Sequence, residues 1–276
     1  MRSAALSSLS QLLLLIASSP HHVAADGTVW ATPHDSYSSS VGVLGCKINT
    51  DRVAYWPGSV DCNNLCLSLT YDDGTADGKR TVKLLRIDQS QGAHDVSYDA
   101  WNYLYTGHSA KKAPVAGGAL AMDYKELPAD DCKELLKTKN KKLPLSASNS
   151  MNFLASCLDQ PGSWVAENYG LYNTLDAVCA WGYDEECTLD WPAANQPTCK
   201  HALGMPVALK DAPVYNVQYP TGDVVVASTG EKVSSPGGST SLAVPLPMQK
   251  GASGRGMLML WMAGSLVWTC LMMGSC

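Results

Sequence analysis

The cysteines are the residues with the clearest chemistry in this sequence. The chain has 10 of them, and Cys270 and Cys276 lie in an apolar C-terminal stretch. In an exported protein an even set of cysteines indicates disulfides, so we expect the other eight to form four bridges. Their spacing leaves the pairing open. The eight are Cys46, Cys62, Cys66, Cys132, Cys157, Cys179, Cys187 and Cys199.

A metal site is the alternative role for these cysteines. No two of them have the CxxC spacing of structural zinc sites, and few histidines lie near them. The sequence also lacks phosphate loops, dinucleotide fingerprints and the Gly-x-Ser-x-Gly hydrolase motif. We therefore expect no metal and no cofactor.

The aromatic residues suit a second kind of chemistry, the stacking of sugar rings. Trp (8) and Tyr (12) dominate, and Phe occurs once. Both side chains combine a flat apolar face with a polar tip, which suits a hydrated sugar surface. Trp101 recurs at helical spacing with Leu104, which predicts that it is buried. Tyr55 and Trp56 are adjacent in a predicted strand, so they point to opposite faces. The clustered aromatics are Tyr55, Trp56, Tyr98, Trp101 and Tyr103.

The segment that must position these aromatics, residues 41–127, has mostly the pattern of strands. A short helix interrupts it, capped by Ser97 and ending by Gly107. Residues 26–40 are polar, and we expect them to be irregular. The predicted strands cover 41–48, 52–56, 66–71, 80–87 and 118–124.

After Pro128 the pattern becomes helical. Four of the eight cysteines lie beyond residue 150. Short helices alone are marginal, so we expect residues 129–221 to form a helical extension stapled by disulfides. The predicted helices cover 130–137, 149–158, 163–169 and 172–180.

The N-terminus predicts export. Residues 1–25 contain Arg2, an apolar centre at 12–17 and the small residues Val23, Ala24 and Ala25, which together are typical of a cleaved signal peptide. The apolar centre is too short to span a bilayer.

The C-terminus predicts a lipid anchor. Residues 257–276 contain no charged side chain, and the Ser/Gly/Pro-rich stretch 222–256 precedes them as an expected stalk. Small residues followed by an apolar tail are typical of a glycosylphosphatidylinositol (GPI) signal, with Ser239, Gly251 and Ser253 as candidate attachment residues. The alternative is a plain transmembrane helix. With an anchor, the protein would meet the membrane only through lipid and would lie on the outer face or in the wall.

The overall charge argues against a nucleic-acid partner. Charged residues make up 16% of the chain and the formal net charge is −5. The one basic run lies around 137–142, which is too little to neutralise a phosphate backbone.

Four pieces of the stretch from Cys62 to Cys132 resemble the six-stranded double-psi β-barrel of barwin, expansins and related secreted proteins, including cerato-platanins and small endoglucanases. They follow the family's order and lie at 62–66, 82–89, 93–101 and 117–127. The whole chain looks like a fungal surface protein. The resemblance implies a fold that is mainly β with an α extension (α+β): a barrel over 41–128 followed by the helical segment.

The resemblance also implies that Asp95 is the key carboxyl group. In the endoglucanases and expansins, the Asp of the matching His-Phe-Asp piece is the acid, and a second carboxylate acts as base in inverting hydrolysis. Trp56 is followed here by Pro57 where the endoglucanases have Asp, and Asp51 is the nearest substitute. A second departure is Ser90, where barwin has Cys. Asp95 could equally be an ordinary carboxylate at the start of a helix.

These observations predict a polysaccharide-binding protein that does not hydrolyse its ligand. The expected partner is a wall polymer: chitin, β-glucan or cellulose. Two alternatives stay open, a glycoside hydrolase-like enzyme with Asp95 as acid and a protein-binding module such as an inhibitor or host-interacting effector. The predicted ligand-contacting residues are Tyr55, Trp56, His94, Asp95 and Tyr98.

Overall fold

The computed structural model of the chain describes residues 26–76 and 78–233. The predicted signal peptide (1–25), the candidate attachment residues Ser239, Gly251 and Ser253, and the apolar tail (257–276) lie outside these residues. Within them, no helix combines the length and the apolar character needed to cross a membrane.

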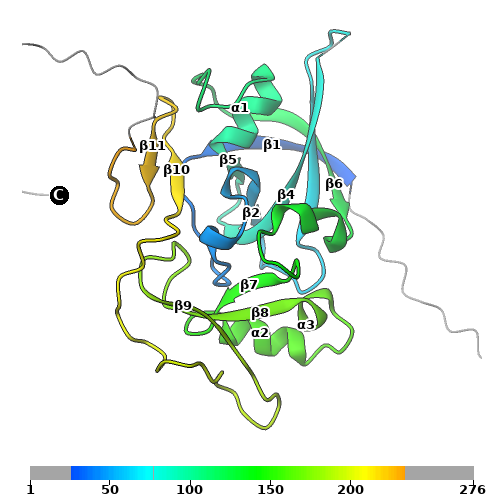
Figure 1. The fold of residues 1–276 in the computed structure, drawn as a ribbon. Helices are drawn as coiled ribbons and strands as arrows, with labels where there is room; N and C mark the ends of the chain where they lie inside the picture. The colour runs from blue at the N-terminus through cyan, green and yellow to red at the C-terminus, as the bar shows by residue number, and fades with distance from the viewer. Residues whose placement is uncertain (1–25, 77, 234–276) are drawn as a thin grey trace, which may run out of the picture. The chain divides into compact units, whose positions relative to one another are not determined.

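Six strands close into a barrel, as predicted (Figure 1). Their order around the barrel is β1-β5-β2-β4-β3-β6, with β1–β5 and β2–β4 parallel and the other pairs antiparallel. Exchanging β1, β2 and β3 with β4, β5 and β6 leaves this pairing unchanged, so the barrel consists of two interlocked three-strand halves. The strands are β1 Asp26–His34, β2 Val53–Pro57, β3 Cys66–Asp72, β4 Lys79–Ser90, β5 His94–Ser97 and β6 Leu120–Leu127.

The prediction that residues 26–40 are irregular is wrong for 26–34, which form β1. Val29 and Ala31 point into the barrel while Thr28 and Trp30 point out, the alternation of a half-buried strand. The stretch 41–48, predicted as a strand, contains only a 3-10 turn at Gly45–Lys47 and isolated bridges. The barrel therefore begins at residue 26 rather than 41.

The predicted short helix is α1, Tyr98–Thr106, which ends at Gly107 with a left-handed φ of 80°. Trp101, a residue of this helix, is fully buried, as predicted. Its indole N–H donates to the Ala31 carbonyl at 3.2 Å and so ties α1 to β1. Gly117 approaches the same ring so closely that a Cβ there would lie 2.3 Å from the ring.

The extension is less helical than predicted. Helix α2, Met151–Leu158, forms as expected, and α3, Trp164–Glu167, is a single turn. The predicted helix 130–137 is the 3-10 helix Ala129–Leu135, and the predicted helix 172–180 is wrong because its start belongs to a buried strand. A three-stranded sheet, β7-β8-β9, forms the centre of the extension. Its strands are β7 Leu143–Ser146, β8 Tyr169–Thr174 and β9 Gly182–Cys187.

Two short strands follow the extension, β10 Tyr215–Val217 and β11 Val224–Val226, and pair with each other. The expected stalk therefore does not begin at 222. Val217 is buried against the barrel core, and the Asn216 amide oxygen accepts from the Tyr37 backbone N–H at 2.9 Å.

All eight predicted cysteines form four disulfides, which confirms that prediction and shows the pairing. Three bridges join the barrel half of the chain to the extension, and Cys187–Cys199 lies within the extension. Disulfides of this number are typical of proteins made in an oxidising compartment. The pairs are Cys46–Cys179, Cys62–Cys157, Cys66–Cys132 and Cys187–Cys199.

Candidate functional site

Asp95 lies on the outer face of the barrel, in a row of side chains that crosses four strands. Its partner in β1 is Thr32, its partner in β2 is Tyr55, and Tyr55 is paired in turn with Asp88 of β4. The Thr32 hydroxyl donates to Asp95 Oδ1. Asp95 is partly exposed, whereas Asp88, at the other end of the row, is buried. Asp95 is therefore the accessible carboxylate of this row.

The buried end of the row is held by the loop after β1. The Ser38 hydroxyl donates to Asp88 Oδ2 at 2.6 Å, and the backbone N–H groups of Ser40 and Gln89 donate to Oδ1. Burial raises the pKa of Tyr55, and the Asp88 and Asp95 carboxylates raise it further, so the phenol stays protonated and donates to the Ser36 carbonyl.

Three of the predicted ligand-contacting aromatics are buried. Tyr55, Trp56 and Tyr98 expose 5%, 7% and 1% of their surface. Tyr55 and Trp56 do point to opposite faces, as predicted, because they belong to different core clusters. The Tyr98 hydroxyl donates to the Val115 carbonyl at 2.8 Å. None of the three rings presents a stacking face to solvent.

His94 and Asp95 are neighbours in sequence but lie on opposite faces of β5. His94 is paired with Ala31, which points into the barrel, and its ring meets Trp56 edge-on at 4.6 Å. Burial lowers the pKa of His94, and nearby Arg86 lowers it further against the opposing effect of Asp95. His94 thus lies at the barrel end and does not share the Asp95 surface.

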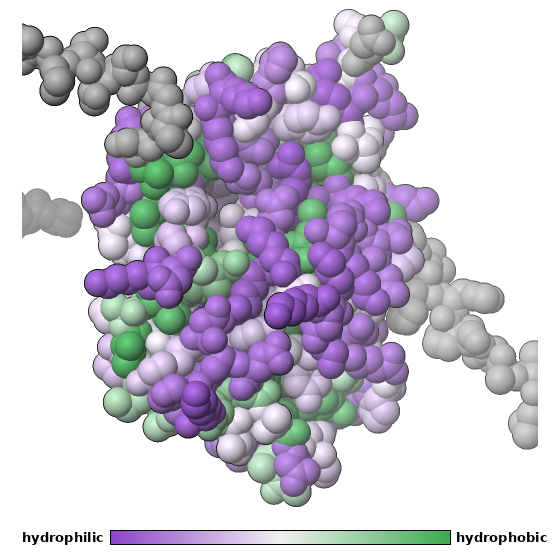
Figure 2. Space-filling view, in the orientation of Figure 1, coloured by the Kyte–Doolittle hydropathy of each residue, from purple (hydrophilic) through white to green (hydrophobic). Residues whose placement is uncertain are grey.

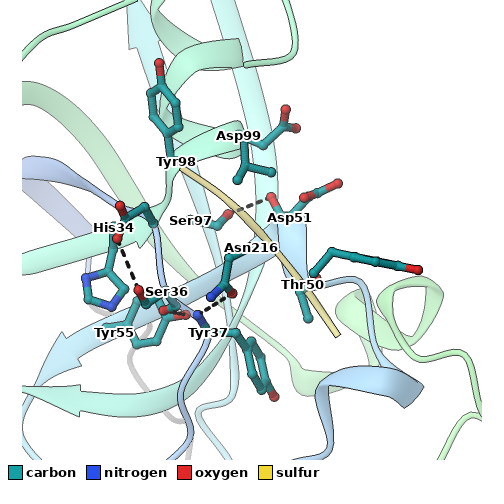
Figure 3. Close-up of a pocket in the computed structure, with 13 residues that line it drawn as sticks. His34, Ser36, Tyr37, Thr50, Asp51, Tyr55, Ser97, Tyr98, Asp99 and Asn216 are labelled. Carbon is teal, nitrogen blue, oxygen red and sulfur yellow. Dashed lines mark hydrogen bonds between the residues drawn. The ribbon is translucent and has the colours of Figure 1, made fainter. Parts of the chain in front are cut away.

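Asp51 lines a shallow pocket that does not include Asp95 (Figure 3). The pocket has an empty volume of about 260 Å³ and lies between α1, the loop after β1 and β10. Figure 3 shows the hydrogen bond that the Ser97 hydroxyl donates to the Asp51 backbone carbonyl, at 2.6 Å. The Asp51 carboxylate itself forms an ion pair with Lys111. A free second carboxylate across from Asp95 is therefore not found at this position.

Asp99, in the same pocket wall, was missed in the sequence. It is 4% exposed, pairs with Arg52 at 3.0 Å and accepts the Ala110 backbone N–H at 2.9 Å. Its first-turn position in α1 was visible, but its partner lies 47 residues away. These contacts give Asp99 a structural role in docking α1.

Trp30 is an exposed aromatic residue on the barrel that was not predicted from the sequence. It exposes 66% of its surface and stands two residues before Thr32 on the same outer face of β1. The sequence signal that indicates this strand is the alternation of Thr28, Trp30 and Thr32 with the apolar residues Val29 and Ala31. The structure thus places one open indole beside the one accessible carboxylate of the row.

No family model matches the chain, and no curated protein is similar to it in sequence. Among solved structures, the chain is similar to the crystal structure of cerato-platanin 2 from M. perniciosa, with 16% identity and a TM-score of 0.29. The match covers 38% of this chain and 98% of that chain. The pairing of the six strands by itself defines the closed barrel.

Proposed function

We propose that this protein binds a wall polysaccharide on the outer face of its barrel, without cleaving it. The observation that carries the proposal is the open indole of Trp30 beside Thr32 and Asp95. Leaving a ring of this size in water forgoes roughly 2 kcal/mol of burial free energy. A flat aromatic next to a hydrogen-bonding carboxylate suits a sugar, which has apolar ring faces and hydroxyl edges.

The contacts of Asp51, the candidate second carboxylate, and of Asp88, the other carboxylate in the row of Asp95, favour binding over hydrolysis. Inverting hydrolysis needs a carboxylate free to activate water. The Asp51 carboxylate is neutralised by Lys111, and the buried Asp88 oxygens are filled by three donors. In this proposal Asp95 contacts the ligand, while Tyr55, Trp56 and Tyr98 hold the strands that carry it.

The surface character and the disulfides fit an extracellular, hydrated setting. Figure 2 shows a face that is mostly hydrophilic, with hydrophobic colour confined to separate patches. We further propose that residues 1–25 direct export and that a GPI anchor at Ser239, Gly251 or Ser253 tethers the protein to a fungal cell surface. Release of the protein from cells by a phosphatidylinositol-specific phospholipase tests the anchor, and retention after treatment argues against it.

Co-sedimentation with insoluble chitin, β-glucan and cellulose tests the binding. We expect the protein to sediment with at least one polymer and Trp30→Ala to lose about tenfold in affinity, equivalent to about 1.4 kcal/mol. Trp181→Ala is the matched control, because it removes another exposed indole (46%) that belongs to the extension. No retention on any polymer, or equal loss in both variants, contradicts the proposal.

A further inference from the structure

Trp30 lies between two threonines that each hold a carboxylate on a neighbouring strand. The Thr28 hydroxyl donates to Asp123 Oδ1 on β6 at 2.7 Å, and the Thr32 hydroxyl donates to Asp95 Oδ1 on β5. The register places Thr28 opposite Asp123 and Thr32 opposite Asp95. The indole is therefore flanked by one carboxylate on each side of its strand.

The strand geometry gives the scale of this arrangement. Residues two apart on a strand are separated by about 7 Å and neighbouring strands by about 5 Å, so each carboxylate is anchored roughly 8 Å from the Trp30 backbone. Asp123 is exposed and Asp95 partly exposed. The Oδ1 atom of each carboxylate accepts the hydrogen bond from its threonine, and within 26–76 and 78–233 no donor reaches either Oδ2.

The other charged residues on this face leave it acidic. Asp26 lies opposite Lys125 in the register of β1 and β6. The exposed Lys125 stands two residues beyond Asp123 on β6. Asp26, Asp95 and Asp123 thus share the face with the Lys125 ammonium group and with the His34 imidazole, which stands two residues beyond Thr32 on β1. A polymer of sugar acids would be repelled, and a neutral polymer would have to bury carboxylates without a charged partner.

We propose that this face selects a cationic amino-sugar polymer, that is, a chitin whose acetyl groups have been removed; the inference rests on the proposed function and names its ligand class. One protonated amine pairs with Asp95 Oδ2 and another with Asp123 Oδ2, while a sugar ring between them lies on the indole. The face of Trp also attracts cations directly. An acetylated amine has no charge and cannot form either pair.

The test compares glucosamine hexamer with N-acetylglucosamine hexamer at pH 5.5, using the full-length chain and calorimetric titration. We expect the glucosamine hexamer to bind at least tenfold more tightly, with the advantage lost in 0.5 M NaCl. Asp95→Asn and Asp123→Asn should each weaken the glucosamine hexamer severalfold and leave the acetylated one unchanged. Asp130→Asn, which removes an exposed charge from the 3-10 helix Ala129–Leu135, is the matched control and should change neither.

The outcomes separate the two proposals. Equal or tighter binding of the acetylated hexamer, still lost in Trp30→Ala, overturns the amine selectivity and leaves polysaccharide binding standing. Loss of selectivity in Asp130→Asn as large as in Asp123→Asn also overturns it, because net charge rather than position would then decide. Failure of both hexamers and of every insoluble polymer overturns both proposals.

Discussion

The Thr32 hydroxyl donates to Asp95 Oδ1 across the parallel pair β1–β5. This contact fixes one oxygen of the carboxylate against the barrel wall, and no donor within 26–76 and 78–233 reaches the other oxygen. A carboxylate held in this way loses less rotamer freedom when a ligand arrives. We therefore regard Thr32 as a positioning residue for Asp95.

A double-mutant cycle measures that role. Thr32→Val keeps the side-chain shape and removes the hydroxyl, so we expect the affinity for the glucosamine hexamer to fall threefold to tenfold because Asp95 is no longer oriented. Asp95→Asn should cost at least as much. The double variant should be no weaker than Asp95→Asn alone, since Thr32 acts through Asp95. Additive losses in the same titration would assign Thr32 a separate contact with the ligand.

Much of the barrel follows from local sequence patterns, but its closing strand does not. Strand β3 alternates and ends at the turn signal 72–74, and β4 follows the turn signal 77–78, so their places were predictable. β1 has few apolar residues, and its identity as a strand depends on pairing with β5 and β6, which lie more than 60 residues away in the chain. Because β1 was missed, Trp30 was missed with it. The predicted aromatics Tyr55 and Trp56 failed as stacking candidates because strand alternation says which sides they occupy, but not what covers each side.

The Asp99–Arg52 pair should be important for stability rather than binding. Asp99→Ala leaves the Arg52 guanidinium and the Ala110 N–H without their partner in a mostly buried site. We expect a loss of about 2 kcal/mol in the free energy of unfolding, measured by urea denaturation. Glu134→Ala removes a surface ion pair with Lys83 and should cost under about 1 kcal/mol. Similar losses in the two variants would contradict the structural role of Asp99.

The disulfides should differ in their contribution to stability according to the loop each closes. Cys46–Cys179 spans 133 residues and Cys187–Cys199 spans 12. Chain-entropy arguments give about 5 kcal/mol for the long loop and about 3 kcal/mol for the short one. We expect the Cys46→Ala/Cys179→Ala variant to unfold at clearly lower denaturant than the Cys187→Ala/Cys199→Ala variant. The reverse order would mean that the Cys187–Cys199 bridge holds structure well outside its own loop.

Glu185 should set part of the acid stability of the extension. Burial acts to raise its pKa, but hydrogen bonds from the Asn173 amide, the His201 backbone N–H and the His201 ring outweigh this and lower the pKa to about 2. Its ordinary value is 4.5. Because the folded pKa is depressed, the stabilisation is fully present above about pH 4.5 and is lost as the pH falls towards 2.

Glu185→Gln removes the titrating carboxylate and with it this dependence of stability on pH. We expect the variant to be less stable than the native chain at pH 6, and the difference to shrink steadily as the pH falls from 4.5 to 2, because the native carboxylate takes up its proton across that window. Thermal unfolding at half-unit pH steps measures it. Glu134→Gln, at an exposed site where the carboxylate lies 3.5 Å from Lys83, is the control and should track the native curve. A Glu185→Gln curve that runs parallel to the native one through this window would show that the carboxylate titrates alike in the folded and unfolded chain.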